Sequence, residues 1–184
     1  MKKIIFFIIL SHFFIGAFAQ KQANVWYFGR NAGLDFNSGT PTALTDGQIS
    51  TLEGCSTFSD KDGNLLFYSD GITVWDKNHD VMRYSTGGLA NDLKGDPSST
   101  QSGMIIPRPE STTIYYLFTV DDGIDGLNLY TIDVSLNGGV GEVIAGPVDL
   151  SFGKESSWSE KVAAVRGNDC DTYWVVSPVG NEYY

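Results

Sequence analysis

The sequence predicts an all-β protein made of antiparallel blades of the β-propeller type. Aromatic residues make up 13% of the 184 positions, 21 residues are Gly and only 6 are Pro. Short runs rich in Val, Ile, Tyr, Phe, Trp and Thr alternate with clusters of Gly, Asp and Asn, a pattern typical of strands joined by turns. Four of these runs look alike and recur at intervals of about one blade, which favours a repeat architecture.

The four similar runs begin at Val25, Leu65, Tyr115 and Tyr173, so their starts lie 40, 50 and 58 residues apart. A second set of strand-like segments precedes the last three runs by 11, 12 and 12 residues: GCSTFSD at Gly54, GMIIPRP at Gly103 and KVAAVRG at Lys161. Each pair therefore predicts a hairpin. Asp62-Gly63 lies in the first turn, where Gly tolerates the positive φ that tight hairpin turns require.

A further strand is expected after three of the runs, in GLDF at Gly33, ITVWD at Ile72 and LNLYTIDV at Leu127. The chain would then hold about three to four blades of three or four strands, with a plain β-sandwich as the alternative. Runs of four apolar residues indicate strands buried on both faces, so we expect Trp26, Trp75 and Trp174 in the core. Trp158, in the polar segment SSWSEK, is the tryptophan expected to be exposed.

A propeller ring needs at least four blades, so residues 20–184 are predicted to be a truncated repeat domain with an incomplete ring, a fragment of a longer protein. Residues 1–19 are predicted to be a signal peptide. They combine Lys2 and Lys3 with an apolar stretch and an Ala17-Phe18-Ala19 cleavage motif. An uncleaved membrane anchor is the alternative. No later stretch is long enough to span a membrane, so no span is expected after cleavage.

The chain is acidic, with 12 basic and 22 acidic residues and a net charge of −10. Loss of Lys2 and Lys3 with the signal peptide would make the net charge −12. Such a protein repels phosphate backbones and anionic lipids, which excludes nucleic acid as a partner. An exported chain permits a disulfide between Cys55 and Cys170; two small buried thiols are the alternative.

Few residues have the chemistry of a catalytic site. His79 is the only histidine after the signal peptide, and we expect it to be a solvated loop residue in DKNHD. The chain has too few His and Cys residues for a zinc site of the usual kind. No pair of carboxylates stands out in the sequence as a candidate for glycoside hydrolysis. The sequence therefore predicts no catalytic or cofactor-binding residues.

Two acidic, Gly-rich segments are weak candidates for calcium, because alternating carboxylates can wrap a hard cation. The candidate ligands are Asp60, Asp62, Asn64, Asp121, Asp122 and Asp125. Turn chemistry is the favoured alternative, since Asp and Gly also serve hairpin geometry. The polar loop Gly95 to Ser102 is a candidate ligand-binding loop, although its side chains more often satisfy neighbouring backbone groups.

The chain also resembles a known family along nearly all of its length after the leader. The matching stretches include NVWYFGRNAGLDFNSGTPTALTDG at Asn24, TLEGCSTFSDKDGNLLFYSDGITVWDKNHDVM at Thr51 and GDPSSTQSGMIIPRP at Gly95. IYYLFTVD at Ile114 and VSLNGGVGEV at Val134 continue the match. They are similar to the N-terminal propeller-like region of Bacteroidetes exported proteins that carry a type B sorting domain for the type IX secretion system, often called gliding-motility-associated. The C-terminal sorting domain of that family is not in this sequence. The resemblance implies a secreted or surface-attached product and no established reaction.

Together these observations predict an exported, non-catalytic binding or adhesion module at the surface of a Gram-negative bacterium, either secreted or on its outer membrane. Its expected partner is a protein or glycan ligand at the cell surface. No cofactor is expected other than calcium at the sites named above. A glycan-active enzyme on a propeller scaffold and a structural component of an export or gliding apparatus are the alternatives.

Overall fold

The structure is all-β, as the sequence predicts. The computed structural model describes residues 21–121, 123–169, 171–180, 182 and 183, so the predicted signal peptide, Asp122 and Cys170 lie outside it. Within these ranges the only helical segments are two short 3-10 helices, η1 (Asn137–Gly139) and η2 (Glu155–Ser157). In the same ranges there is no apolar helix of the length needed to cross a bilayer.

The first two sheets are three-stranded antiparallel meanders, which we call the first and second sheets. Short turns join their strands, so consecutive segments of the chain pair directly. The first sheet contains β1 (Val25–Phe28), β2 (Ala32–Asp35) and β3 (Thr42–Leu44). The second sheet contains β4 (Ser56–Ser59), β5 (Leu65–Ser69) and β6 (Val74–Asp76).

The third sheet has five strands in the order β7-β11-β10-β9-β8. Four of them form a continuous antiparallel meander: β8 (Met104–Pro107), β9 (Ile114–Val120), β10 (Leu127–Asp133) and β11 (Glu142–Asp149). The short strand β7 (Arg83–Tyr84) joins the outer edge parallel to β11. The third sheet is thus a four-stranded antiparallel meander with one added edge strand.

The fourth sheet is the hairpin of β12 (Ala163–Arg166) and β13 (Tyr173–Val176). A small ribbon of β14 (Pro178–Val179) and β15 (Glu182–Tyr183) follows it. The three hairpins predicted from sequence, β4–β5, β8–β9 and β12–β13, are all confirmed as antiparallel pairs. The third strands predicted after them, β6 and β10, are confirmed as well.

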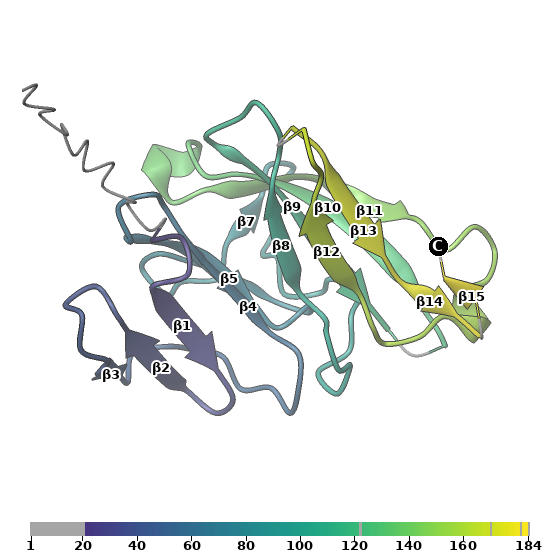
Figure 1. Ribbon diagram of the computed structural model, residues 1–184, viewed down its shortest axis with the longest axis horizontal. Coiled ribbons are helices and arrows are strands. Elements are labelled where there is room, and N and C mark those ends of the chain that lie inside the picture. Colours follow the sequence, from purple (N-terminus) through teal and green to yellow (C-terminus); the bar gives the residue numbers. More distant parts are fainter. Residues whose placement is uncertain (1–20, 122, 170, 181, 184) are drawn as a thin grey trace, which may run out of the picture.

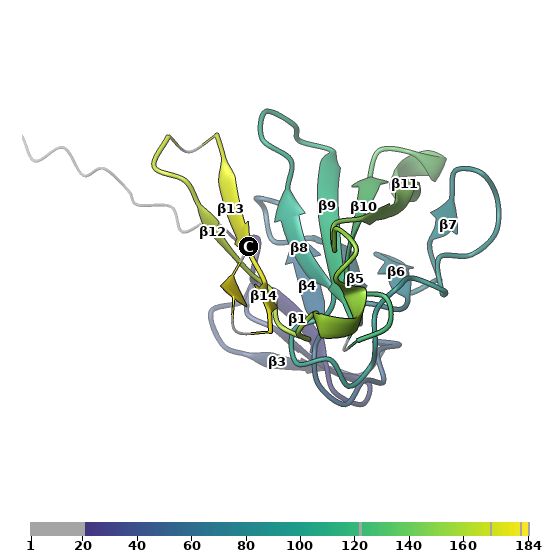
Figure 2. The same cartoon turned by 90° about the vertical axis from the view of Figure 1, so that its right-hand side faces the viewer.

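The four sheets pack face to face in chain order, with one apolar cluster between each neighbouring pair (Figures 1 and 2). Tyr27 and Tyr68 lie between the first and second sheets. Phe67 and Leu117, both fully buried, lie between the second and third. Phe118 and Val175 lie between the third and fourth. Each fully buried side chain of this size contributes about 1.5–3 kcal/mol of transfer free energy, so these clusters hold the array together.

No sheet closes on itself in the described part of the chain. Among the described residues, no further sheet of three or more strands packs on the outer face of the first or of the fourth sheet. Consecutive sheets touch through their first strands, because β1 contacts β4 and β4 contacts β8.

The tryptophans depart from the sequence prediction in three of four cases. Trp158 is 3% exposed, and its indole Nε1 donates to Ser177 Oγ at 2.8 Å. Trp26 and Trp174 are instead 48% and 69% exposed, and only Trp75 is buried as expected. The reason is that β1 and β13 lie in the two end sheets, where every second side chain faces away from the array.

Candidate functional site

A cleft opens where three first strands begin. The segments leading into β4, β8 and β12 surround a hollow of about 440 Å³. Its floor is apolar, made by Met104, Ile105 and Val162, and polar residues of the preceding segments rim it. We call it the strand-start cleft; its lining residues are Glu53, Gly54, Cys55, Ser56, Thr100, Gln101, Ser102, Met104, Ile105, Val162 and Ala163.

Two further hollows extend the strand-start cleft on either side. One of about 490 Å³ lies along β1 and β4 and shares Cys55 and Ser56 with it. Another of about 340 Å³ lies along the fourth sheet and shares Gln101, Val162 and Ala163. The three hollows therefore adjoin one another through shared lining residues, and together we call them the depression.

Backbone contacts between distant segments build the cleft. Gly54 N donates to Ser99 O at 3.0 Å and Leu52 N donates to Pro97 O at 3.1 Å. These bonds run to backbone carbonyls of the polar loop that ends at Ser102. Of its hydroxyls, Ser102 Oγ accepts from a backbone group, Val120 N, whereas Thr100 Oγ1 donates to the side chain of Glu160. The last three residues of the loop, from Thr100 to Ser102, also line the cleft, so the same loop has a surface available to a ligand.

Two aromatic side chains project from β1 at the first-sheet end of the depression. Trp26 and Phe28 are both exposed and line the hollow beside Cys55. The indole of Trp26 is held in place, because Nε1 donates to Ala23 O at 2.7 Å and the ring packs 4.9 Å from that of Phe36. The sequence does not distinguish these residues from core residues, because Val25 to Phe28 are all apolar and show no alternation.

The polar groups of the depression suit recognition. Glu53, Gln101 and Lys161 are exposed at its rim, where they offer an acceptor, an amide and a cation. Burial raises the pKa of the Cys55 thiol, so this side chain is a neutral thiol at physiological pH. A neutral thiol is a poor nucleophile, and Cys55 therefore contributes packing surface.

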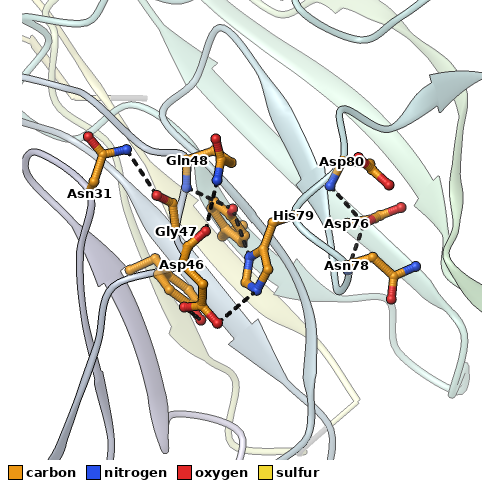
Figure 3. A network of polar contacts seen from close by, with 10 residues as sticks. Asn31, Asp46, Gly47, Gln48, Asp76, Asn78, His79 and Asp80 are labelled. Carbon is orange, nitrogen blue, oxygen red and sulfur yellow. Dashed lines mark hydrogen bonds and ion pairs between the residues drawn. The ribbon is translucent and has the colours of Figure 1, made fainter.

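His79 is not the solvated loop residue that the sequence predicts. Its side chain is 20% exposed and lies between the first and second sheets (Figure 3). Nδ1 is 3.1 Å from the Tyr68 hydroxyl, and Nε2 is 3.4 Å from Asp46 Oδ2. The Tyr68 hydroxyl also accepts a hydrogen bond from Gln48 N at 3.1 Å, so it contacts both the loop after β3 and the imidazole.

This network ties the loop after β3 to both the first and the second sheet. Asn31 Nδ2 donates to Gly47 O at 2.9 Å, and the Tyr27 hydroxyl donates to Asp46 Oδ1 at 2.8 Å (Figure 3). The bond from Tyr27 lowers the pKa of the Asp46 carboxyl. Tyr27 and Tyr68 are buried, so a substrate cannot reach either phenol, and the arrangement positions the first sheet on the second.

The buried tyrosine phenols are expected to make the folded protein less stable at alkaline pH. Burial raises the pKa of Tyr68 and of Tyr130 from 10.0 to about 12. A pKa that is higher in the folded state means that the stabilisation is complete below pH 10 and is lost as the pH rises through about 12. We expect the melting temperature to fall steeply over this interval, and Tyr68→Phe to make the fall shallower. A melting temperature that is flat between these pH values would contradict this account.

In the first calcium candidate, the carboxylate of Asp60 is hydrogen-bonded within the β4–β5 hairpin turn. Asp60 Oδ1 accepts hydrogen bonds from the backbone N of Asp62 and Asn64, and Asp60 Oδ2 accepts one from Asn64 Nδ2. Asp62 forms a 2.7 Å ion pair with Lys61. These contacts are those expected of the turn interpretation.

The second calcium candidate behaves similarly where it is described. Asp121 Oδ2 accepts from Asp125 N at 2.8 Å, and Asp125 Oδ1 pairs with Lys94 Nζ at 3.0 Å. Asp122 lies outside the described residues. Across the described ranges, no three His, Cys, Asp or Glu side chains are grouped so that they would hold a metal ion. Calcium binding stays a prediction from the sequence.

No protein-family model, curated protein or solved structure matches this chain. The strand-start cleft and the two hollows beside it bring apolar and polar side chains from several sheets to the surface.

Proposed function

We propose that this chain is an exported, non-catalytic binding module that holds a neutral glycan in the strand-start cleft and its two extensions. One observation carries the proposal: three hollows adjoin through shared lining residues, and a fixed, half-exposed indole and several polar side chains line them. Apolar floors with a few polar groups that fix orientation are typical of ligand sites.

The chemistry of the depression favours a sugar polymer. The face of the Trp26 indole offers a flat apolar surface to the C–H face of a pyranose ring. Its hydrogen bond to Ala23 O already orders the side chain, so binding costs little conformational entropy. Glu53 and Gln101 offer hydrogen-bonding groups to sugar hydroxyls. The net charge of −10 disfavours anionic polysaccharides, so the preferred ligand is a neutral one.

We also propose that the four sheets are consecutive blades of a propeller-like array. The support is that the second, third and fourth sheets each begin with the same kind of hairpin, and that β1, β4 and β8 are in contact in succession. Export to the surface of a Gram-negative bacterium is supported by the leader-like residues 1–19 and by the resemblance to sorting-domain proteins. These proposals place the depression on an exposed protein outside the cell, where glycans are abundant.

Substitution of Trp26 tests the ligand site. The purified protein is first screened against neutral and anionic polysaccharides and surface proteins, and the best ligand is then titrated by calorimetry. We expect Trp26→Ala to weaken binding of a neutral glycan by about tenfold or more, because anchoring aromatics dominate such interfaces. Trp174→Ala is the matched control, since it removes an exposed tryptophan from another sheet, and it should leave affinity unchanged.

Other results of the same screen would replace the proposal. Binding to surface proteins alone would mean that the ligand is a protein and not a glycan. Glycan binding that is insensitive to Trp26→Ala would mean that the binding site lies outside the depression. Turnover of the bound glycan would establish the enzyme alternative. A protein that binds nothing in the screen but co-purifies with envelope proteins would favour the structural alternative.

A further inference from the structure

A separate hollow of about 430 Å³ lies where the turn after β6, the strand β7 and the short helix η1 meet. It shares no lining residue with the three hollows of the depression. The turn and β7 contribute polar and charged residues to it, and Val81 and Leu89 contribute an apolar surface. Its volume lies within the range of about 300–1,000 Å³ that is typical of small-molecule sites. We call it the β6–β7 hollow.

The turn after β6 presents polar side chains to the β6–β7 hollow. Asp76, Asn78 and Asp80 alternate along the chain, and Figure 3 shows their side chains on the side of the turn that faces away from His79. Asp76 Oδ1 accepts hydrogen bonds from the backbone N of Asn78 at 2.7 Å and of Asp80 at 3.2 Å, which fixes the turn. Asp76 is only 5% exposed, and it forms no ion pair with any residue that the structure describes. Because buried charges in proteins are ordinarily paired, the hollow has an uncompensated negative charge in its wall.

The opposite charge comes from Arg83 on β7. Arg83 lines the same hollow and is exposed, and within the described ranges its guanidinium has no ion-pair partner. Its register neighbour on β11, Glu142, lies beyond ion-pair distance. Charges of both signs therefore line one hollow without pairing to each other. A planar guanidinium is suited to bind a carboxylate through two parallel hydrogen bonds.

We propose that the β6–β7 hollow binds a small zwitterion, namely an α-amino acid with an apolar side chain. The ammonium group of the ligand lies at Asp76 and Asp80, and its carboxylate lies at Arg83. Its side chain covers Val81 and Leu89, and Leu89 is 44% exposed in the free protein, so binding buries apolar surface. A zwitterion suits the hollow better than a simple ion, since a metal ion is repelled by Arg83 and an anion is repelled by the two carboxylates.

Calorimetric titration of the purified protein with L-leucine tests this proposal. We expect a dissociation constant in the sub-millimolar range. L-Leucinamide lacks the carboxylate of leucine, and isocaproate lacks its ammonium group. Each analogue should bind about tenfold or more weakly than leucine, because each loses one charge-assisted contact. Calcium chloride is titrated in parallel as the probe of a cation site.

Single substitutions assign the two charged ends of the ligand. Arg83→Gln should weaken leucine binding by about tenfold or more and leave leucinamide binding unchanged, because leucinamide has no carboxylate for Arg83 to bind. Asp80→Asn should weaken leucine binding and leave isocaproate binding unchanged. Both side chains are exposed, so the β-type circular dichroism spectrum should persist. Asp62→Asn is the matched control, since it removes an exposed carboxylate from the β4–β5 turn, and it should not change leucine affinity.

Three outcomes would overturn the proposal. The first is the absence of binding heat at millimolar leucine, and the second is leucine affinity no higher than that of both analogues. The third is binding of calcium without binding of leucine, which would identify the turn after β6 as a cation site. No glycan enters these titrations, and Trp26→Ala should leave them unchanged, so their outcome is separate from that of the glycan-binding test.

Discussion

Replacement of Trp158 by Ala is expected to lower the free energy of unfolding by about 3–5 kcal/mol. The indole is 3% exposed and packs in the cluster between the third and fourth sheets. Its Nε1 donates to Ser177 Oγ, which in turn donates to Lys161 O at 2.6 Å. The substitution leaves a large cavity and removes the donor that orients Ser177, and urea denaturation followed by circular dichroism measures the loss.

Trp174→Ala is the matched control for this experiment, because the sequence pattern predicts that Trp174 is buried and Trp158 exposed, whereas the structure shows the reverse. With 69% of Trp174 exposed, its removal is expected to change the free energy of unfolding by less than about 0.5 kcal/mol, as for most surface substitutions. A larger effect at Trp174 than at Trp158 would mean that the fourth sheet is packed the other way round.

The second large effect is expected at Gly54, where Ala should destabilise the protein by about 3 kcal/mol. An added Cβ would lie 2.4 Å from Ser102 N and 2.6 Å from Ser99 O, and both are backbone atoms that no rotamer change can move. Relief of the clash requires the segment before β4 to separate from the 95–102 loop. The same separation opens the strand-start cleft, so glycan affinity should fall together with thermal stability.

Gly88→Ala separates this steric effect from the general cost of replacing a glycine. Gly88 has φ of +91° and nothing within 4 Å of an added Cβ, so only backbone strain of about 1 kcal/mol is expected. Ligand binding should be unchanged in this variant. Equal losses of stability at the two glycines would rule out the close approach of the two segments at Gly54.

The hairpins could be predicted because their signals are local. Asp62-Gly63 stands in the first turn, with φ of +92° at Gly63, and the Asp60 carboxylate caps that turn by accepting hydrogen bonds from the backbone N of Asp62 and Asn64. Strand pairing of this kind depends on residues within about a dozen positions of one another, and the spacing of such residues is visible in the sequence. The same holds for β8–β9 and β12–β13, whose offsets from segment to run are 12 residues each.

The burial of individual side chains could not be predicted, because it depends on which sheet lies next. Val25 to Phe28 and Tyr173 to Val176 are continuous apolar runs like those of β5 and β9, yet they alternate between buried and open faces. Their sheets lie at the two ends of the array, a position that no local pattern encodes. Trp158 lies among polar neighbours in sequence and is buried because the third and fourth sheets close over it.

By itself, the sequence determined the all-β class, the hairpins and their order along the chain, since turn chemistry and strand propensity act over short distances. Only the tertiary structure decided that Glu53, Thr100 and Val162 line one cleft, that His79 joins two sheets through Tyr68 and Asp46, and that Trp26 and Trp174 face solvent. These features depend on face-to-face packing of sheets whose strands lie tens of residues apart. Apolar packing is non-directional, so the sequence specifies that such faces must be covered without specifying by which segment.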